Sequence, residues 1–367
     1  MEKKEKVYMI LTNGFNPDVR VLKEAVFLCQ KGYEVEILCW DRKGEHIKKT
    51  NEVREDGVKV TRFFIPSKPG SGMKQLHPFL KFIKSIRKYL KNKTYSYIHC
   101  HDFDGMIAGY YATILRKKKP IIFDMHESYK QKIYYKLYFI FKHFIKKADY
   151  IIYVNEEQIK EWKQKEKEKC IYLPNYPEIR HYIPIEKERQ DGIYRINFVG
   201  AVRDYDSLAT LIEASKKKDN VKVGIYGDGV AYERLKKENE NNNVIISGKF
   251  DGSKESGKIY QNTDILYCVY NPEIHNWRIS YPTKLFEAII TKTPIIVAEN
   301  TVASDFVQKK GIGAVVAYKN KEALINIIDK VILHYEEYRN NLEKISKEYQ
   351  WEDISKNLEQ IYTKECS

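Results

Sequence analysis

The stretch YPTKLFEAIITKTPIIVAEN, residues 281–300, contains a predicted helix followed by a predicted buried strand. Pro282 suits the first turn of a helix, and apolar residues then recur at helical spacing until Pro294, which opens the strand-like run PIIVA. Lys284 and Glu287 lie three positions apart near the helix start. They fit either a solvated pair on the helix surface, which contributes about 0.2–0.5 kcal/mol, or a ligand site. A helix followed by an apolar strand is the repeating unit of an α/β fold.

The chain is long enough for two domains and shows no sign of a membrane span. Its 367 residues, 43% of them hydrophobic, exceed what one core usually organises. Its six cysteines contain no C-x-x-C pair, and their spacing fits reduced, mostly buried thiols rather than a zinc site. The first apolar run, residues 7–11, is too short for a signal-peptide core or a membrane span. We therefore expect a cytoplasmic protein.

Positive charge is concentrated in the first half of the sequence. Residues 1–185 contain 37 Lys+Arg and 22 Asp+Glu, a net +15, whereas residues 186–367 contain 27 and 28, a net −1. Segments 77–91 and 129–150 combine basic residues with aromatic and aliphatic residues at helical spacing, and such helices can lie on an anionic membrane surface. The alternative is an ordinary surface helix in a lysine-rich protein. Nucleic acid is not an expected partner, because no nucleic-acid-binding motif is present.

Strand-like runs alternate with helical stretches twice along the chain. A segment around residues 174–192 with three prolines separates the two sets. We therefore predict an α/β protein with two doubly wound domains. The predicted strands are 7–11, 34–40, 58–64, 95–100, 120–124, 150–154, 194–200, 221–227, 243–248, 264–269, 294–299 and 313–318.

Polar and glycine-rich loops follow these predicted strands. Ligands of doubly wound sheets bind beyond the carboxyl ends of the strands, where glycine permits close backbone approach and helix N-termini favour phosphate. In the second half, the loops VGAVRDYDS, YGDGV and SGKF have this character. In the first half, the loops NGFNPDVR, HCHDFDG and DMHES would bring together, at one rim, His101, Asp102, Asp124, His126 and Glu127.

Several of these motifs resemble the family-four glycosyltransferases, which are retaining enzymes of the GT-B fold. The resemblance runs nearly end to end and rests on NGFNPDVRVLKEAVFLCQKGYEVEIL, IHCHDFDG, IIFDMHES, INFVG, SYPTKLFEAIITKTPIIVA and YQWEDISKNLEQIY. It implies two doubly wound Rossmann-like domains with a cleft between them. The N-terminal, acceptor-binding domain would span residues 1–185 and the nucleotide-sugar-binding domain residues 190–348. A C-terminal helix at about 351–363 would cross back to the first domain.

The resemblance also implies roles for individual residues. Glu287 would accept hydrogen bonds from the donor ribose, and Lys284 would face the donor diphosphate at a helix N-terminus. Arg203 would bind the departing phosphates, and His126 would lie beside the reacting sugar. The implied catalytic residues are His126, Arg203 and Lys284; the donor-binding residues are Gly14, Gly248, Lys249, Phe250, Thr283, Leu285 and Glu287; the acceptor-side candidates are Asn16, Asp18, Arg20, His101, Asp102 and Glu127.

Two positions depart from the family pattern. The family often has a donor-contacting glutamate eight positions before the ribose glutamate, and this chain has Ile279 there, with Asn276 or His275 as nearby substitutes. A family lysine in the loop after the first strand of the second domain falls at Asp206. Arg203 and Lys284 would then carry more of the diphosphate charge.

The resemblance implies transfer of a sugar, with retention, from a nucleotide diphosphate sugar to a lipid-linked or oligosaccharide acceptor in surface polysaccharide synthesis. The donor would be a UDP-sugar rather than a GDP-sugar, and the enzyme would work on the inner face of the cell membrane. No metal or other cofactor would be required, because catalysis would consist of orientation and charge stabilisation. The DFD at residues 102–104 resembles the metal-binding pair of another transferase fold, but that fold has a single nucleotide-binding domain. A sugar-nucleotide 2-epimerase and a non-catalytic partner of another transferase remain as alternatives.

Overall fold

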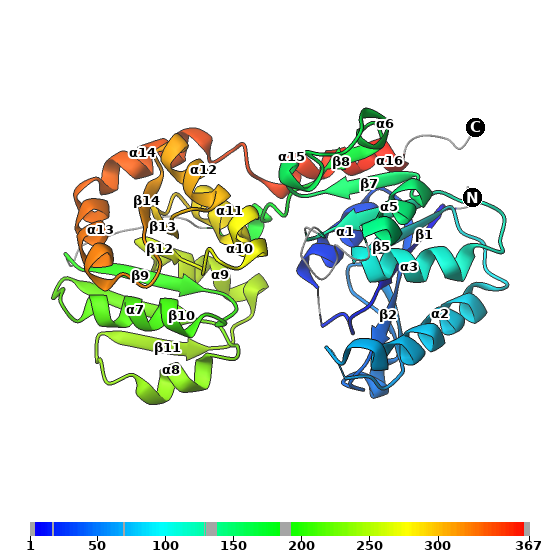
Figure 1. Ribbon diagram of the computed structural model, residues 1–367, viewed down its shortest axis with the longest axis horizontal. Coiled ribbons are helices and arrows are strands. Elements are labelled where there is room, and N and C mark those ends of the chain that lie inside the picture. Colours follow the sequence, from blue (N-terminus) through cyan, green and yellow to red (C-terminus); the bar gives the residue numbers. More distant parts are fainter. Residues whose placement is uncertain are drawn as a thin grey trace. The chain divides into compact units, whose positions relative to one another are not determined.

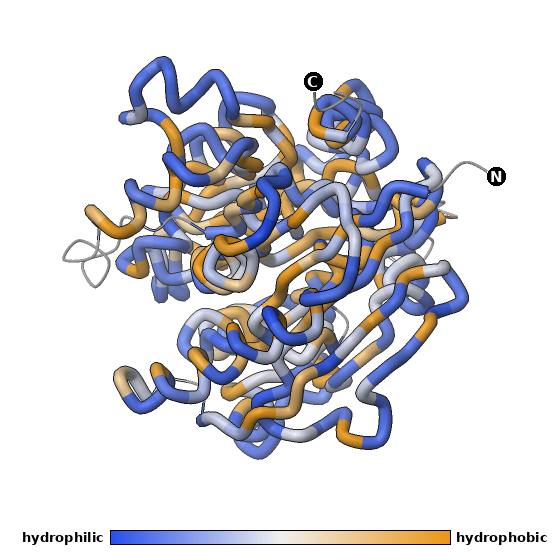
Figure 2. The backbone as a smooth tube through the Cα atoms, turned by 90° about the vertical axis from the view of Figure 1, so that its right-hand side faces the viewer, coloured by the Kyte–Doolittle hydropathy of each residue, from blue (hydrophilic) through white to orange (hydrophobic). Residues whose placement is uncertain are grey.

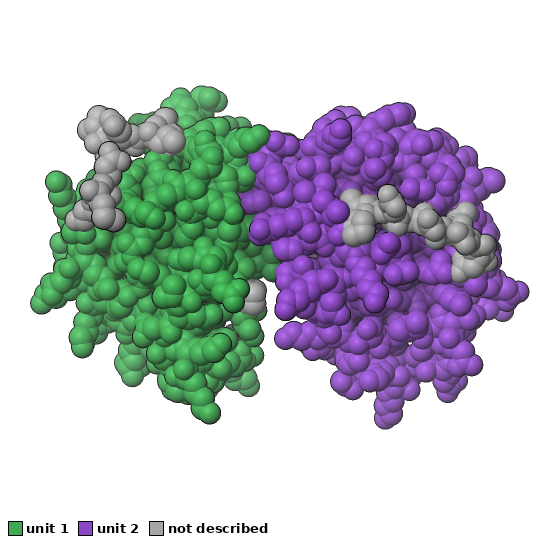
Figure 3. Space-filling model, turned by 180° about the vertical axis from the view of Figure 1, so that it is seen from behind, with its two compact units in different colours: residues 1–174, 355–367 green, residues 175–354 purple. Residues whose placement is uncertain are grey.

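The protein folds into two compact units. The computed structural model describes residues 4–16, 18–68, 70–127, 129, 138–183 and 192–362. The first unit consists of residues 1–174 and 355–367, and the second of residues 175–354 (Figure 3). The chain therefore enters the second unit once and returns to the first at Ser355.

Residues 175–183 pack with the second unit, although from the sequence we assign them to the first domain. The Tyr176 ring meets Phe286 edge-on, with 4.6 Å between ring centroids, and the Tyr182 ring meets Tyr260 at 5.4 Å. The backbone N–H of Trp351 donates to the Pro177 carbonyl, so the end of the second unit extends past residue 348. Burial of these aromatic rings moves the domain boundary to residue 174.

The first unit is built on an eight-stranded sheet with the order β3-β4-β2-β1-β5-β6-β7-β8 (Figure 1). Neighbouring strands are parallel except β3 and β4. The direction of strand addition reverses between β1 and β5, and a ligand crevice is expected at such a switch point. The strands are β1 (Lys6–Leu11), β2 (Glu34–Asp41), β3 (Asn51–Val53), β4 (Lys59–Phe64), β5 (Tyr97–His101), β6 (Ile121–Met125), β7 (Tyr150–Tyr153) and β8 (Cys170–Tyr172). The helices are α1 (Val19–Gln30), α2 (Leu76–Leu90), α3 (Asp102–Thr113), α5 (Tyr138–Lys147), α6 (Gln164–Lys167) and α16 (Glu359–Tyr362), with 3₁₀ turns η1 (Ile47–Lys49), η2 (Gly72–Gln75), η3 (Glu156–Gln158) and η5 (Ser355–Leu358).

The second unit is built on a six-stranded, fully parallel sheet with the order β11-β10-β9-β12-β13-β14. Its switch point lies between β9 and β12. The strands are β9 (Tyr194–Val199), β10 (Val221–Tyr226), β11 (Val244–Gly248), β12 (Ile265–Cys268), β13 (Ile295–Ala298) and β14 (Gly313–Val316). The helices are α7 (Tyr205–Ser215), α8 (Tyr232–Glu238), α9 (Gly252–Gln261), α10 (His275–Ile279), α11 (Thr283–Ile290), α12 (Val302–Lys310), α13 (Lys321–Leu333), α14 (Tyr335–Ile345) and α15 (Trp351–Ile354), with the 3₁₀ turn η4 (Ile179–His181).

The strands of the second sheet are buried on both faces. Successive residues of a strand point to opposite faces, and Ile296 belongs to one hydrophobic cluster whereas Ile295 and Val297 belong to another. Figure 2 shows hydrophobic and hydrophilic stretches alternating along the chain. Two-sided burial explains why these strands read as continuous apolar runs in the sequence.

All twelve predicted strands are present, which confirms the predicted α/β fold with two parallel sheets. Two further strands, β3 and β8, are three residues long and were too short to predict. The predicted basic helix is present as α2, but its apolar stripe faces the interior, where Phe82 stacks on Trp40 with 5.4 Å between ring centroids. This stripe therefore cannot insert into a membrane. None of the helices in the described residues is long and apolar enough to cross a bilayer.

Candidate active site

The carboxyl ends of β5 and β6 bring together the polar residues predicted for the first unit. His101 and Asp124 are register partners at the ends of these parallel strands, and their side chains meet, with His101 Nδ1 3.1 Å from Asp124 Oδ2. Asp102 begins α3 directly after β5, and His126 follows β6. Strand register therefore places three chain segments around one carboxylate.

His126 is held by a carboxylate on each ring nitrogen. Its Nε2 lies 2.7 Å from Asp124 Oδ2, and its Nδ1 lies 3.3 Å from Asp102 Oδ2. Burial alone would lower its pKa, but the charges of Asp102 and Asp124 outweigh burial and raise the pKa to about 9. The side chain remains 16% exposed. His126 is therefore an imidazolium at neutral pH, suited to holding a negative or polar group rather than to taking a proton.

Arg20 lies beneath this pair and fixes Asp124. Its Nε and Nη2 donate to the two oxygens of Asp124 at 3.1 and 2.7 Å, and its Nη2 also lies 3.2 Å from Glu24 Oε1. Burial opposes ionisation of Asp124, yet the Arg20 charge holds the pKa of Asp124 well below its usual range. Burial and the Asp124 charge raise the pKa of Glu24 to about 7.

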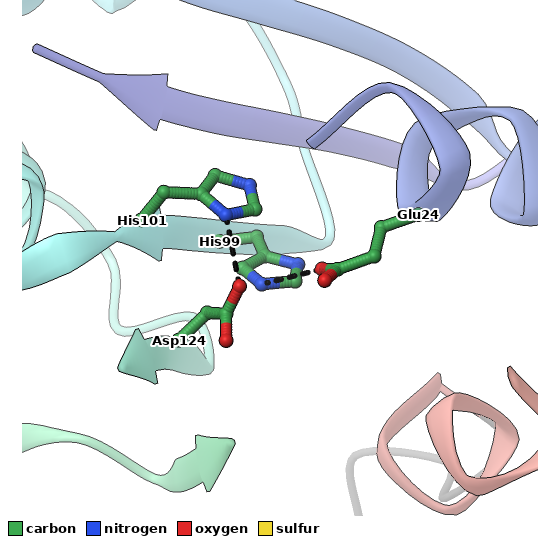
Figure 4. Close-up of side chains that lie close together, drawn as sticks. All are labelled: Glu24, His99, His101 and Asp124. Carbon is green, nitrogen blue, oxygen red and sulfur yellow. Dashed lines mark hydrogen bonds and ion pairs between the residues drawn. The ribbon is translucent and has the colours of Figure 1, made fainter. Parts of the chain in front are cut away.

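Four buried side chains at and around Asp124 could bind a cation (Figure 4). Glu24, His99, His101 and Asp124 each offer one ligand atom, and these atoms lie within 4.8 Å of one another. His99 Nε2 faces Glu24 Oε2 at 3.6 Å. The cation that contacts both carboxylates in this structure is the Arg20 guanidinium, which a metal ion would have to displace.

The acceptor-side candidates fall into two groups. Arg20 and His101 are buried and support the residues above them. Asn16 and Glu127 are exposed, Asp18 accepts the Val21 N–H as the cap of α1, and Asp102 keeps a side chain that is 35% exposed. Asp102 also has a positive φ of 62° and accepts a hydrogen bond from Tyr129 Oη at 2.7 Å, and strained backbone of this kind is concentrated at functional sites.

In the second unit, α11 directs a lysine toward the end of β9. Lys284 Nζ lies 5.3 Å from the Phe198 ring centroid and 5.7 Å from that of Tyr270. A Cβ added to Gly200 would lie 2.5 Å from Nζ, so the lysine occupies space that only glycine leaves. Among the described residues no carboxylate lies within ion-pair distance of Nζ. Lys284 is therefore a cation available to an anionic ligand.

The N-terminus of α11 adds backbone donors beside Lys284. The first N–H groups of a helix lack partners within the helix. Leu285 is fully buried and its N–H donates to the Pro282 carbonyl at 2.9 Å, which removes it from the predicted diphosphate contacts. The N–H groups of Thr283 and Lys284 remain at the helix start. Both the helix dipole and these groups favour an anion.

Glu287 is held by tyrosines. Tyr260 Oη donates to Glu287 Oε2, and Tyr182 also hydrogen-bonds Glu287. Burial, followed by the Glu287 charge, raises the pKa of both tyrosines well above its usual value. Lys284 and Glu287 form no ion pair with each other, so a solvated helix-surface pair is the wrong interpretation of the two residues.

Glycine backbones line the carboxyl ends of β9, β10 and β11. The Gly200 N–H donates to Tyr226 O and the Gly227 N–H to Gly248 O, both at 2.8 Å, and a Cβ on Gly227 would lie 1.8 Å from Gly200 O. Gly248 has a φ of 81°. Beyond these glycines, Arg203 and Lys249 are exposed and Phe250 is half-buried. At this edge, closely packed glycine backbones lie next in the sequence to exposed cations.

The residues at the two departures from the family pattern face other partners. Asp206 forms an ion pair with Lys319 at the start of α7, so it faces a surface lysine. Ile279 is half-buried at the end of α10. Sequence reasoning missed Glu24, His99, Tyr129, Tyr182 and Tyr260, whereas Gly200 and Gly227 lie in the predicted glycine loops VGAVRDYDS and YGDGV. The i,i+4 spacing of Arg20 and Glu24 and the alternate-residue spacing of His99 and His101 on a strand could have indicated the first two.

Gly14, predicted as a donor contact, belongs to the first unit. It follows β1, and its carbonyl accepts a hydrogen bond from Arg62 Nε at 3.2 Å. A Cβ on Gly14 would meet ordinary contacts at 3.6 Å or more, from His46 and Asp41. Gly14 therefore has room for a side chain, and its assignment as a donor contact stays a prediction.

Two sequence families match consecutive parts of the chain. Residues 19–175 match Glycosyltransferase Family 4, and residues 183–349 match Glycosyl transferases group 1. Together the matches cover most of both units. No curated protein matches the whole sequence at a significant level.

Solved structures with the same fold align along nearly the entire chain. Sucrose-phosphate synthase from Thermosynechococcus elongatus aligns with a TM-score of 0.76 and 13% identity, covering 98% of each chain. Alr3699/HepE from Anabaena, in complex with UDP and glucose, aligns with a TM-score of 0.71 and 12% identity over 99% of this chain and 100% of that one. WaaG, a glycosyltransferase involved in lipopolysaccharide biosynthesis, aligns with a TM-score of 0.67 and 12% identity over 98% and 100%. At these identities the likeness establishes the fold, which is GT-B.

Proposed function

The chain belongs to the glycosyltransferases, joining a family 4 domain to a group 1 domain, and on that premise we propose that it transfers a sugar with retention from a nucleotide diphosphate sugar to an acceptor hydroxyl. The observation that carries the proposal is Lys284. It lacks a carboxylate partner among the described residues, and it lies at a helix N-terminus against the glycine end of β9. A diphosphate supplies the missing negative charge.

Glu287 would hold the opposite end of the same nucleotide. Its carboxylate is half-buried and oriented by Tyr260, and a fixed carboxylate is suited to accept hydrogen bonds from two ribose hydroxyls. Arg203 and Lys249, both exposed at this edge, would contact the leaving phosphates and the base respectively. We favour UDP as the nucleotide, because the structurally similar Alr3699/HepE binds UDP and UDP-glucose.

In the proposed mechanism the enzyme stabilises the leaving group rather than forming a covalent intermediate. The acceptor hydroxyl would attack from the face that the diphosphate leaves, and a phosphate oxygen would take its proton. Lys284 and Arg203 would stabilise the charge that grows on the diphosphate, and the His126 imidazolium would orient the reacting sugar. This scheme requires no metal ion.

We propose a lipid-linked glycan as the acceptor, presented at the inner face of the cell membrane. The exposed face of α2 carries Lys81, Lys84, Arg87 and Lys88, and each charge near an anionic surface contributes about 1 kcal/mol. Because the apolar stripe of α2 is buried, this attraction would be electrostatic only. Part of the second basic segment, residues 130–137, lies outside the described residues.

One labelling experiment tests the proposal against its alternatives. The purified protein is incubated with radiolabelled nucleotide sugars and a bacterial lipid extract. Label in the lipid phase supports the proposed transferase, whereas label in a soluble glycan contradicts the lipid-linked acceptor. An isomerised sugar nucleotide would indicate a 2-epimerase, and unchanged donor across all sugars would indicate a non-catalytic partner. The matched control is Glu287→Ala, which should abolish the label.

A further inference from the structure

One pocket of the first unit lies beyond the ends of β1 and β2. It has a volume of about 500 Å³. None of its lining residues belongs to the cluster around His126. The lining consists of Thr12, Asn13, Gly14, Asn16, Asp18, Trp40, Asp41, Arg42, Lys43 and Glu45.

The carboxylates around this pocket are already engaged. Asp41 accepts backbone N–H groups of Gly44, Glu45 and His46 at 2.9 to 3.2 Å, which closes the loop after β2. Asp18 caps α1 and accepts from Asn13. Glu45 lies 3.3 Å from Lys43, so these two charges offset each other. The net charge of the lining residues does not indicate an anion-binding pocket. The hydrogen-bond donors that have no partner in the described part of the chain do indicate one.

Arg42 is a lining cation with one buried donor that has no partner among the described residues. Its guanidinium carbon lies over the Trp40 ring, 4.3 Å from the centroid, and its side chain is 19% exposed. Its nearest carboxylate oxygen, Asp104 Oδ2, is 3.6 Å away and already accepts from Thr12 Oγ1 at 2.7 Å. Arg42 Nε is buried and has no hydrogen-bond partner among the described residues.

A second unsatisfied polar atom lies at the rim of the same pocket. His46 Nε2 is buried without a partner among the described residues, and a Cβ on Gly14 would lie 3.6 Å from the His46 ring. A buried donor without a partner is costly, and a guanidinium fork matches the two oxygens of a carboxylate or phosphate. The contact with Trp40 helps to hold the guanidinium in place.

We propose that this pocket binds an anionic group of the acceptor, a carboxylate or a phosphate, through the Arg42 guanidinium. The inference rests on the proposed function, because it concerns the acceptor of that reaction. It narrows the acceptor class to acidic glycans, such as those containing a uronic acid, or to sugars carrying a phosphate.

The test measures binding of small probes to the full chain by calorimetry. Glucose, glucuronic acid and glucose 1-phosphate are titrated with UDP at saturation, so that the nucleotide site cannot bind the phosphate. At least one of the two anionic probes should bind at least ten times more tightly than glucose. Tighter binding of glucuronic acid identifies a carboxylate ligand, and tighter binding of glucose 1-phosphate identifies a phosphate ligand.

Three variants locate the effect. Arg42→Gln should weaken the preferred anion about 10- to 100-fold, and Arg42→Lys should restore part of the loss because it keeps the charge without the fork. Lys118→Gln removes the same charge from a side chain that is 85% exposed and lies outside the pocket lining, and it should change affinity less than twofold. All three should keep the wild-type UDP affinity, which also shows that they fold.

Equal binding of glucose and both anions, or unchanged anion binding in Arg42→Gln, would overturn the inference. Failure of the wild type to bind any nucleotide would instead contradict the proposed function. The two failures are therefore distinguishable in the same titration series.

Discussion

His126 Nε2 lies 2.7 Å from Asp124 Oδ2, so the half-buried imidazole is fixed to a buried carboxylate. Arg20 holds that carboxylate from below with two hydrogen bonds. The ring is thereby prevented from rotating, and its charge is maintained by Asp124 and, on the other nitrogen, by Asp102. Pre-orientation of a charged group is what electrostatic stabilisation of a transition state requires.

Replacing His126 with alanine should lower turnover and leave donor affinity almost unchanged. His126 belongs to the first unit, whereas Lys284 and Glu287 belong to the second. We expect kcat to fall by about 10²- to 10³-fold, with the dissociation constant of UDP changed less than twofold. Steady-state kinetics and calorimetry measure the two quantities. A variant that retains most of the wild-type turnover would remove His126 from the active centre.

The stability of the protein should decrease as pH rises from about 6.5 to 9. The pKa of His126 is raised from 6.5 to about 9, so its stabilising contribution is complete below pH 6.5 and is lost as pH rises through 9. Asp102 and Asp124 raise this pKa, and His101 and Arg20 also face the ring cluster. The pKa of Glu24 is raised from 4.5 to about 7. Its contribution to stability is therefore lost in a lower window, as pH rises from about 4.5 to 7.

Urea unfolding of the wild type at pH 6.5 and 9.5 measures this dependence. The free energy of unfolding should fall by on the order of 2–3 kcal/mol, since one pKa unit corresponds to about 1.4 kcal/mol. His126→Gln is the control and should reduce the fall. An identical pH profile in both proteins would contradict the assignment of a charged His126.

Lys284→Ala and Glu287→Ala should each weaken nucleotide binding by about 10- to 100-fold without unfolding the protein. Each variant removes a charge-assisted contact, worth about 1.5–3 kcal/mol. Neither side chain belongs to the buried apolar set of α11. Lys254→Ala, whose side chain is 81% exposed, is the matched control and should bind normally. If calorimetry gives wild-type affinity for both variants, the donor site lies elsewhere.

Gly200→Ala should displace Lys284 and weaken nucleotide binding. The added Cβ would lie 2.5 Å from Lys284 Nζ, and the φ of 128° is one that alanine rarely adopts. Gly32→Ala is the control, because Gly32 has a φ of 93° but nothing within 4 Å of an added Cβ. Both variants should lose stability from backbone strain, and only Gly200→Ala should lose UDP affinity, by about tenfold or more. Equal UDP binding by the two would show that Lys284 makes no donor contact.

Binding to anionic liposomes should be weakened by salt and by removing the exposed charges of α2. The test variant changes Lys81, Lys84, Arg87 and Lys88 to glutamine, and co-sedimentation is compared at low and high salt. Electrostatic attraction decays over a Debye length of about 8 Å at physiological salt. The control changes Lys216, Lys217, Lys236 and Lys237, which are exposed in the second unit. Equal binding of neutral and anionic lipid would favour an ordinary lysine-rich surface and a soluble acceptor.

The twelve longer strands were predictable because two-sided burial leaves continuous apolar runs in the sequence. The meeting of His101, Asp102, Asp124 and His126 was also predictable, since parallel strands end at one edge. How deeply each of these side chains is buried was not predictable from the sequence. Arg20 was predicted as an acceptor-side residue, but it is buried, and Asp124 and the Leu173 carbonyl satisfy its guanidinium.

Contacts that depend on distant segments also escaped prediction. Tyr260 orients Glu287 from α9, and nothing in the local pattern of either helix indicates that they pack together. Similarly, the pairing of α2 with Trp40 decides which face of the helix is hidden, and the same stripe would suit a membrane equally well. The periodicity of a helix specifies a face, and tertiary packing decides what covers it.

The return of the chain to the first unit has a consequence for synthesis. Tyr362 donates or accepts a hydrogen bond with His99 Nδ1 at 2.8 Å, and its carbonyl accepts from Tyr33 and Tyr97 at 2.6 and 3.1 Å. These partners are translated long before Tyr362. Domains generally fold as units while the ribosome is still working. The first unit therefore cannot complete these contacts until the second unit and residues 355–362 have left the exit tunnel. A ribosome that stalls before that point leaves His99 Nδ1, Tyr33 and Tyr97 without their partner.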